Sequence, residues 1–172
     1  AYLEEAAVML ADPRNKVDLM LLTKRPESVA RMVPTSWIVA WPARIWLGAT
    51  IATADDVDGQ IARDLVRLKS DFGMTTFASV EPMLDAGPVI GPWLRSVDLV
   101  IIGGESGHGA RPFDVDAAYR LVNAAHEAGA KVWFKQMGSV WASQHGGALA
   151  KGAGHGQDPY RWPEWARLRE LP

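Results

Sequence analysis

Charged, amide and hydroxyl side chains recur in this chain at one relative place, directly after short apolar segments. They are Lys24, Arg25, Glu81, Glu105, Ser106, Lys135 and Gln136, and Gly103 and Gly104 precede the second glutamate. Lysine and arginine bind phosphate or carboxylate groups, glutamate transfers protons or binds amines and hydroxyls, and glutamine pairs with amides or base edges. Because ligands of α/β proteins gather at the carboxyl-terminal ends of the strands, this pattern predicts a single binding face.

The two cations and the first carboxylate each have a functional and a structural interpretation. Lys24 and Arg25 precede Pro26, which opens a predicted helix, so they are predicted to contact an anion such as phosphate or carboxylate. Alternatively, they are solvated cations of a loop. Glu81 is predicted to act as a base, or to bind a ribose hydroxyl or an amine. The competing interpretation is an internal salt bridge to Arg25 or Lys135.

Residues 103–109 contain four glycines, which permit positive φ angles and close approach of the backbone. This loop is predicted to surround an anion with its N–H groups, although it lacks the Gly-Lys-Ser/Thr of a P-loop and the full GxGxxG fingerprint. The alternative is a tight turn in which Glu105 pairs with Arg111. Lys135 and Gln136 are predicted to bind an anion and an amide or base edge; alternatively, both face solvent and Gln136 bonds to the loop backbone.

Five apolar segments with strand character alternate with helical segments along the chain. The predicted strands are residues 17–22, 45–51, 75–80, 99–102 and 131–135. The predicted helices are residues 2–10, 26–33 and 115–128, together with one that Thr53 or Asp55 caps and that runs to Phe72. Since the strands are apolar on both faces, they predict a parallel α/β sheet, either doubly wound or part of a (β/α) barrel. Five strands are too few to close an eight-stranded barrel.

The rest of the chain is expected to be irregular or peripheral. Residues 34–44, which are rich in tryptophan and proline, predict an irregular connection. Residues 1–138 are expected to form this α/β unit. Residues 139–172 are expected to form a Gly-rich loop and a tail, residues 158–172, that folds back on the unit as a hairpin or helix.

Composition narrows the class of protein. The chain has 172 residues, enough for one domain, and a net charge of -2, which supplies no overall basic field for nucleic acid. It has no cysteine, which excludes disulfides and thiolate ligands from this chain and favours a cytoplasmic location. No apolar run is long enough to cross a bilayer, so no membrane association is expected. The four histidines show no metal-binding spacing, and no nucleophile elbow indicates a catalytic triad.

Five segments, in order and spacing, resemble the phage Gp37/Gp68-like family, a domain of unknown function. They are residues 22–27, 46–48, 79–84, 100–107 and 134–138. The resemblance implies a TIM-type barrel that is similar to radical S-adenosylmethionine (SAM) enzymes, in which a cysteine cluster holds a [4Fe-4S] centre. Because this chain has no cysteine, we expect it to be the carboxyl-terminal portion of such a protein, lacking the first βα units. The alternative is a short homologue that has lost the cluster.

As part of a larger barrel, the chain is expected to expose a sheet edge at residues 19–22. The resemblance assigns catalytic roles to Glu81, Glu105 and Lys135. It assigns cofactor binding to Lys24, Arg25, Gly103, Gly104, Ser106 and Gln136, with SAM and the cluster present in the full-length protein and no metal bound by this chain.

Two functions follow. The first is an enzyme whose pocket for a small or nucleotide-like ligand lies at the strand ends. The second is a non-catalytic module that binds a nucleotide, a nucleic acid or a phage protein through Lys24, Arg25, Arg111 and Lys135. Salt-dependent binding of oligonucleotides would separate the second from the first.

Overall fold

The structure, a computed structural model, describes residues 2–85, 91–145 and 155–172. Five strands form one parallel sheet in the order β1-β2-β3-β4-β5. They are β1 (Leu19–Thr23), β2 (Ile45–Thr50), β3 (Thr76–Val80), β4 (Leu99–Gly103) and β5 (Lys131–Gln136). The helices are α1 (Tyr2–Ala11), α2 (Val29–Met32), α3 (Thr35–Val39), α4 (Ala54–Asp58), α5 (Gln60–Phe72), α6 (Val115–Glu127) and α7 (Ser139–His145). The prediction of an α/β fold with five parallel strands is confirmed.

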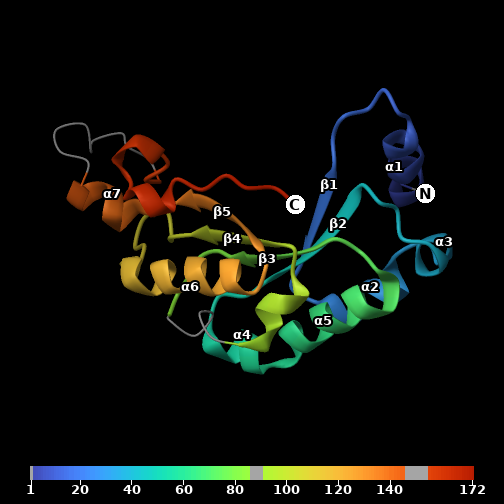
Figure 1. Ribbon diagram of the computed structural model, residues 1–172, viewed down its shortest axis with the longest axis horizontal. Helices are drawn as coiled ribbons and strands as arrows, with labels where there is room; N and C mark the ends of the chain where they lie inside the picture. Colours follow the sequence, from blue (N-terminus) through green and yellow to red (C-terminus); the bar gives the residue numbers. More distant parts are fainter. Residues whose placement is uncertain (1, 86–90, 146–154) are drawn as a thin grey trace.

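The winding of the chain distinguishes between the two predicted architectures. Each strand pairs with the next one along the chain, and α2, α5 and α6 lie along one side of the sheet (Figure 1). A doubly wound sheet reverses its strand order and carries helices on both faces, whereas a (β/α) barrel keeps sequential order and places its helices outside. The arrangement is therefore consistent with part of a (β/α) barrel. Within the described residues, no helix is long and apolar enough to span a lipid bilayer.

The main core lies between the sheet and these helices. Alternate strand residues, including Ala49, Val80, Ile102 and Phe134, are buried in one cluster with side chains of α5 and α6. Parallel strands bury such residues because helices cover that face. The described part of the chain thus obtains most of its hydrophobic stabilisation on the helical side.

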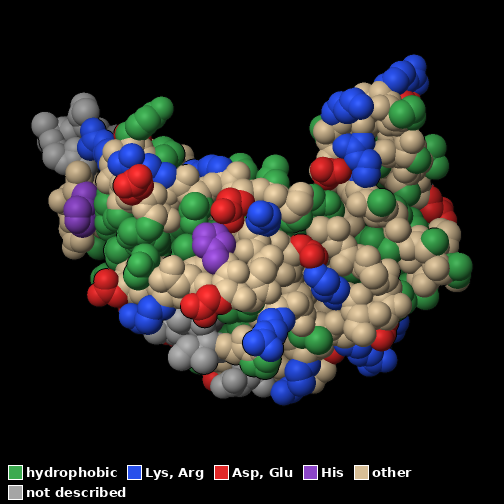
Figure 2. Space-filling view, in the orientation of Figure 1, with side chains coloured by type: hydrophobic (Ala, Val, Ile, Leu, Met, Phe, Trp, Pro, Cys, Tyr) green, Lys and Arg blue, Asp and Glu red, His purple; other side chains and the backbone are tan. Residues whose placement is uncertain are grey.

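The opposite face of the sheet, here called the inner face, has a smaller cluster. Trp46, Phe77 and Leu99 are buried there, and Ile101 and Trp133 pack against them. Gly48 makes this packing possible, because a Cβ at that position would lie 2.3 Å from the ring of Phe77. Above this face, the surface is hollowed (Figure 2). One side of the hollow is formed by α1 and the start of β1, and the other side by α7 and the tail.

Local signals in the sequence explain where the principal helices begin and end. Thr53 and Asp56 form a reciprocal capping box at the start of α4. Asp114 accepts a hydrogen bond of 2.8 Å from the N–H of Ala117 at the start of α6. Gly73, with φ of 62°, ends α5 in the left-handed conformation that favours glycine.

Several predicted boundaries differ from the structure. The segment predicted to be irregular contains α3, which forms because Trp37 is buried against Leu10 and Ile45. The single helix predicted up to Phe72 is broken at Gly59 into α4 and α5. A further helix, α7, follows β5. The Gly-rich loop predicted within residues 139–172 lies partly outside the described residues.

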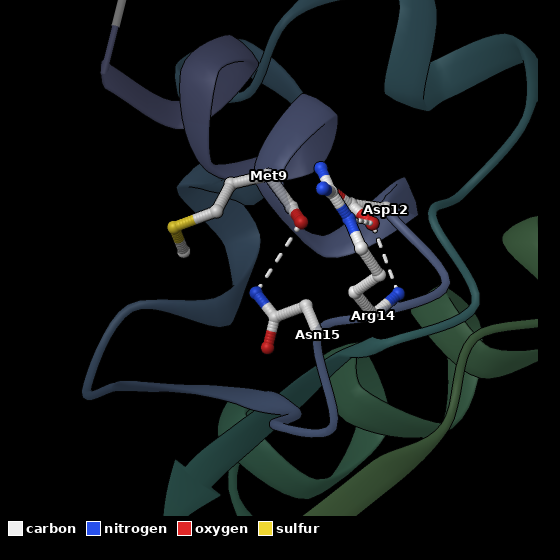
Figure 3. A network of polar contacts seen from close by, with 4 residues as sticks. All are labelled: Met9, Asp12, Arg14 and Asn15. Atoms are coloured by element: carbon white, nitrogen blue, oxygen red, sulfur yellow. Dashed lines mark hydrogen bonds and ion pairs between the residues drawn. The ribbon is translucent and has the colours of Figure 1, made fainter.

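The connection between α1 and β1 is held by side-chain bonds to the backbone (Figure 3). Asn15 Nδ2 donates to the carbonyl oxygen of Met9 at 3.3 Å, and Arg14 forms a two-pronged ion pair with Asp12. Arg44 donates to the Asn15 carbonyl oxygen and pairs with Asp18 at 2.9 Å. These bonds join the start of β1 to the start of β2.

The described part of the tail, residues 155–172, forms neither a hairpin nor an α-helix. Two 3-10 turns, Pro159–Arg161 and Glu164–Ala166, lead into an extended segment along β5. There Arg169 forms an antiparallel bridge with Trp133, and its guanidinium lies 5.0 Å from the ring centres of both Trp133 and Trp162. Burial lowers the pKa of Arg169. The tail therefore covers the outer edge of β5.

Candidate functional site at the strand ends

An ion pair between Glu81 and Lys135 is the centre of the candidate site. Lys135 Nζ lies 2.9 Å from Oε1 and 3.0 Å from Oε2 of Glu81. The two residues come from β5 and from the end of β3, so the pair passes across the end of β4 at Gly103. A Cβ at Gly103 would lie 3.1 Å from Cγ and Cδ of Glu81. Glycine at this position thus leaves the space that the glutamate occupies.

The sheet itself aims both side chains at the inner face. Glu81 follows Val80, which is in register with Ile102, so the carboxylate reaches the end of β4. The register of β4 and β5 then shifts at Ile102 and Gly103, leaving Lys135 as the extra residue of β5. Such a bulge redirects the side chain of the extra residue. The sequence indicated an internal salt bridge of Glu81 with either Arg25 or Lys135, and the structure forms it with Lys135.

The loop after β3 is held in place by backbone bonds to both neighbouring strands. The N–H of Met83 donates to the carbonyl oxygen of Gly103 at 3.0 Å, and the N–H of Leu84 donates to that of Ala52 at 3.1 Å. Glu81 is consequently fixed at its base. Its side chain is 19% exposed, while that of Lys135 is 50% exposed, so the ammonium is the accessible partner of the pair.

Gln136 links the end of β5 to the glycine loop. Its Nε2 donates to the carbonyl oxygen of Gly104 at 2.9 Å and to Oγ of Ser106 at 2.5 Å, and its side chain is buried. A Cβ at Gly104 would lie 2.3 Å from the carbonyl oxygen of Met137, so glycine is required for this close approach. The predicted cofactor-binding residues Gly104, Ser106 and Gln136 are therefore in one network.

Glu105 is held by Arg111, as the alternative interpretation of the loop described. Its carboxylate accepts from Nε and Nη2 of Arg111 at 2.7 and 2.8 Å, and from the Arg111 backbone N–H at 2.8 Å. The side-chain bond, followed by the backbone bond, lowers the pKa of Glu105 from an ordinary 4.5 to about 2. A carboxylate that stays ionised in this way suits the anchoring of a loop better than proton transfer.

Ser139, at the start of α7, is a contact that sequence reasoning missed. Its Oγ accepts from the N–H of Gly107 at 3.0 Å, and its N–H donates to the carbonyl oxygen of Glu105 at 2.9 Å. The serine lies 32 residues beyond Gly107. No local pattern in the sequence indicates the pairing, because only the fold brings α7 beside this loop.

Lys24 and Arg25 lie apart from the other candidate residues. Both follow β1, which β2 separates from β3. Their side chains are exposed and form no ion pair within the described residues. The strand ends thus carry the ion pair of Glu81 and Lys135, the hydrogen bonds of Gln136 to the glycine loop, and a separate pair of cations.

The chain offers no recognisable metal centre in the described ranges. No group of three or more histidine, cysteine, aspartate or glutamate side chains is arranged to hold an ion there. His108, in the glycine loop after β4, is exposed.

Comparison with known proteins yields a family but no characterised relative. A family model described as "Protein of unknown function (DUF5131)" matches residues 3–165. No curated protein matches, and no solved structure matches. The match covers all five strands and every predicted site residue.

Proposed function

This chain belongs to DUF5131, a family of proteins of unknown function, and we propose that its strand ends bind a small ligand with both an ammonium and a carboxylate group. The ion pair of Glu81 and Lys135 carries this proposal. Glu81 binds the ligand's ammonium group and Lys135 its carboxylate. When the ligand enters, Glu81 and Lys135 separate from each other and each pairs with the opposite charge on the ligand. Neither protein charge is therefore left without a counter-charge.

The location of the pair supports a ligand site over a purely structural role. In (β/α) barrels, ligands bind where the strands end, and Glu81 and Lys135 lie there on the face that the helices leave open. Ser106 is partly exposed, and its hydroxyl oxygen accepts a hydrogen bond from Nε2 of Gln136, the residue after Lys135. This hydroxyl supplies a hydrogen-bonding group for a further part of the ligand, such as a ribose.

The resemblance to the phage Gp37/Gp68-like family makes the proposal more specific, with SAM as the ligand and a radical-SAM-like enzyme as the function. The methionine portion of SAM has the required ammonium and carboxylate, so Glu81 and Lys135 fit it. In a radical-SAM-like enzyme, cleavage of SAM to a radical would need an electron from a [4Fe-4S] cluster. The residues of this chain do not fit such a cluster, because the chain has no cysteine, so the chain itself is proposed to bind SAM and not to cleave it.

Within the proposed enzyme, the described residues have different tasks. Lys135 and Glu81 orient the amino-acid end of the ligand, and Gln136 holds the loop that carries Ser106. Glu105, fixed by Arg111, keeps the loop in place. The predicted catalytic role of Glu105 is accordingly replaced in this proposal by a positioning role.

Calorimetry with SAM and decarboxylated SAM tests the binding mode. We expect SAM to bind the chain and L-methionine to compete, with Lys135→Met and Glu81→Gln each weakening SAM binding about tenfold or more. Decarboxylated SAM lacks the carboxylate, so its weaker binding should not change further in Lys135→Met. Lys131→Met, at the opposite end of β5, serves as the control.

Two results would contradict the proposal. One is that neither SAM nor methionine binds at millimolar concentration to protein whose circular dichroism shows a folded state. The other is that SAM and decarboxylated SAM lose affinity equally in Lys135→Met, since the lysine would then not recognise the carboxylate.

The exposed cations Lys24 and Arg25 favour a second function, a non-catalytic nucleotide or nucleic-acid module. In that case an oligonucleotide would bind with an affinity that falls steeply with salt, and Lys24→Ala with Arg25→Ala would reduce the slope by about two. Lys135→Met would then have the smaller effect, because its ammonium is already paired with Glu81. Absence of oligonucleotide binding at low salt would exclude this function.

A further inference from the structure

Asp64 on α5 is a buried aspartate with one carboxylate oxygen that receives no hydrogen bond. The residue is 8% exposed, and Nε2 of Gln60, one turn earlier, donates to its Oδ1 at 2.7 Å. Oδ2 is buried and has no hydrogen-bond partner among the described residues. A carboxylate oxygen that is removed from water without a partner carries a high desolvation cost. A ligand that donates to Oδ2 would remove that cost.

The burial of Asp64 follows from its place on the helix. Leu68 lies one turn after it on the same face of α5 and is buried in one cluster with Val29 of α2. Figure 1 shows α2 beside α5. Aspartate thus occupies a buried helix position that packing alone would give to an apolar residue.

A cavity of about 180 Å³ opens between these two helices, and Asp64 lines it. Its apolar lining comes from both sides, from Pro26 and Ala30 and from Leu68 and Phe72 of α5. A water molecule takes up about 30 Å³ in the liquid, so the space is large enough for a short alkyl chain with a polar end.

The charges around the cavity favour a cation. Among the described residues that line it, Glu27, Asp64 and Asp71 are acidic and Arg67 is basic. Arg67 is already paired with Asp71 at 3.2 Å. Glu27 is exposed and forms no ion pair with another described residue. Two carboxylates therefore remain for a positively charged ligand.

We propose that this cavity binds a primary ammonium group on a short apolar chain, with Asp64 as its counter-charge. A guanidinium group binds a carboxylate through both oxygens, whereas Oδ1 of Asp64 already accepts from Gln60. A compact ammonium group needs Oδ2 alone. A small rotation of the carboxylate brings Oδ2 to the cavity, and the exposed side chain of Gln60 follows it. The alkyl chain then lies against Leu68 and Phe72.

This site is separate from the ion pair at the strand ends. α5 packs on the helical side of the sheet, whereas Glu81 and Lys135 reach its inner face. The ligand also differs, because the proposed occupant of the cavity needs no carboxylate. The two proposals therefore stand or fall independently.

An NMR titration with n-butylammonium at constant ionic strength tests the site. We expect amide shifts at Asp64, Leu68 and Ala30, with no comparable shifts around Gly103. n-Butyltrimethylammonium has the same charge but no N–H, so it should not cause these shifts. Asp64→Asn should weaken binding of n-butylammonium about tenfold or more. Asp116→Asn, an exposed aspartate in the first turn of α6, is the control and should leave the affinity unchanged.

Urea unfolding separates a ligand site from a structural carboxylate. Without the amine, Asp64→Asn should raise the urea midpoint, because a neutral amide without a partner costs less to bury than a carboxylate. A carboxylate that stabilised the helix pair would give the opposite shift. Ala30→Leu fills the cavity from the exposed face of α2, so it should weaken binding while leaving the midpoint nearly unchanged.

A Gly-Lys-Gly peptide with blocked ends distinguishes the two sources of such an ammonium group. Tighter binding of the peptide than of n-butylammonium would assign the cavity to a lysine of a partner protein. Equal or weaker binding of the peptide would assign it to a free amine. Either result supports an ammonium site.

Three results would overturn the proposal. One is the absence of amide shifts on α5 and α2 at millimolar n-butylammonium, which would leave the cavity to water. Another is an affinity that Asp64→Asn does not change. The third is a lower urea midpoint in Asp64→Asn, since the carboxylate would then be satisfied within the folded chain.

Discussion

Lys135 and Glu81 form an ion pair over Gly103, the last residue of the strand that lies between them. The pair depends on three features that are far apart in the sequence: the end of β3, a glycine in β4 and a bulge in β5. The geometry of the candidate site is therefore sensitive to substitution of Gly103, although glycine has no side chain.

Gly103→Val is expected to displace the glutamate. A Cβ alone would lie 3.1 Å from Glu81 Cγ, and the methyl groups of valine would occupy the space of its carboxylate. We expect at least tenfold weaker binding of SAM or methionine, with a loss of about 1–3 kcal/mol in the free energy of unfolding from overpacking. Gly103→Ala should have an intermediate effect. Unchanged affinity in a folded Gly103→Val protein would contradict this role.

Removal of Arg111 should change the acid behaviour of the glycine loop. The pKa of Glu105 is about 2 in the folded protein, against an ordinary 4.5 in an unfolded chain, so its pairing stabilises the fold above the unfolded pKa. That contribution is lost as pH falls from about 4.5 to 2. In Arg111→Gln, the Glu105 pKa should rise toward its ordinary value. The difference in stability between the unsubstituted protein and Arg111→Gln should shrink as pH falls below about 4.5 and vanish only below about pH 2.

Carbon-13 NMR of the Glu105 carboxyl group measures this pKa directly. Arg120→Gln, an exposed arginine on α6, is the matched control and should leave the titration unchanged. A Glu105 pKa that stays near 2 in Arg111→Gln would show that another group holds the carboxylate.

Asp98 connects three elements at the amino-terminal ends of the strands. Its carboxylate lies 2.6 Å from Lys69 Nζ on α5 and accepts from the N–H of the buried Thr76 at 2.8 Å. Asp98→Ala leaves this N–H without its acceptor, and we expect a loss of about 2 kcal/mol in urea unfolding. Asp71→Ala removes an exposed pair with Arg67 and should cost less than about 0.5 kcal/mol. Equal effects of the two variants would contradict this difference.

Glu170 holds the tail on the edge of β5. Its Oε2 accepts from the N–H of Val132 at 2.8 Å and lies 3.0 Å from His126 Nε2. Glu170→Ala should reduce the free energy of unfolding by about 1 kcal/mol and speed hydrogen exchange of the Val132 amide. Glu164→Ala, also in the tail but exposed, serves as the control. Unchanged exchange at Val132 would show that other bonds of the tail protect the edge.

Local patterns predicted most of the elements. The five strands were found within a few residues because apolar runs bounded by turn residues mark buried strands. The caps at Thr53 and Asp114 and the stop at Gly73 also follow from nearby residues. Missed boundaries, such as α3 and the break at Gly59, arose where distant packing or one backbone position overrode the local preference.

Partnerships within the candidate site were less predictable. The sequence indicated that charged residues would meet at the strand ends, and it left Arg25 and Lys135 as equal partners for Glu81. The bulge in β5 and the strand order decided for Lys135. No pattern in the sequence indicated the contact of Ser139 with Gly107.

The amino-acid pattern thus specifies strands, helix ends and the family, because each depends on residues close together in the chain or on their order. Tertiary structure alone decides which charges are paired and which sheet edge the tail covers. The physical reason is distance: an ion pair requires contact within about 4 Å, and here that contact is set by strand register across more than fifty residues of chain.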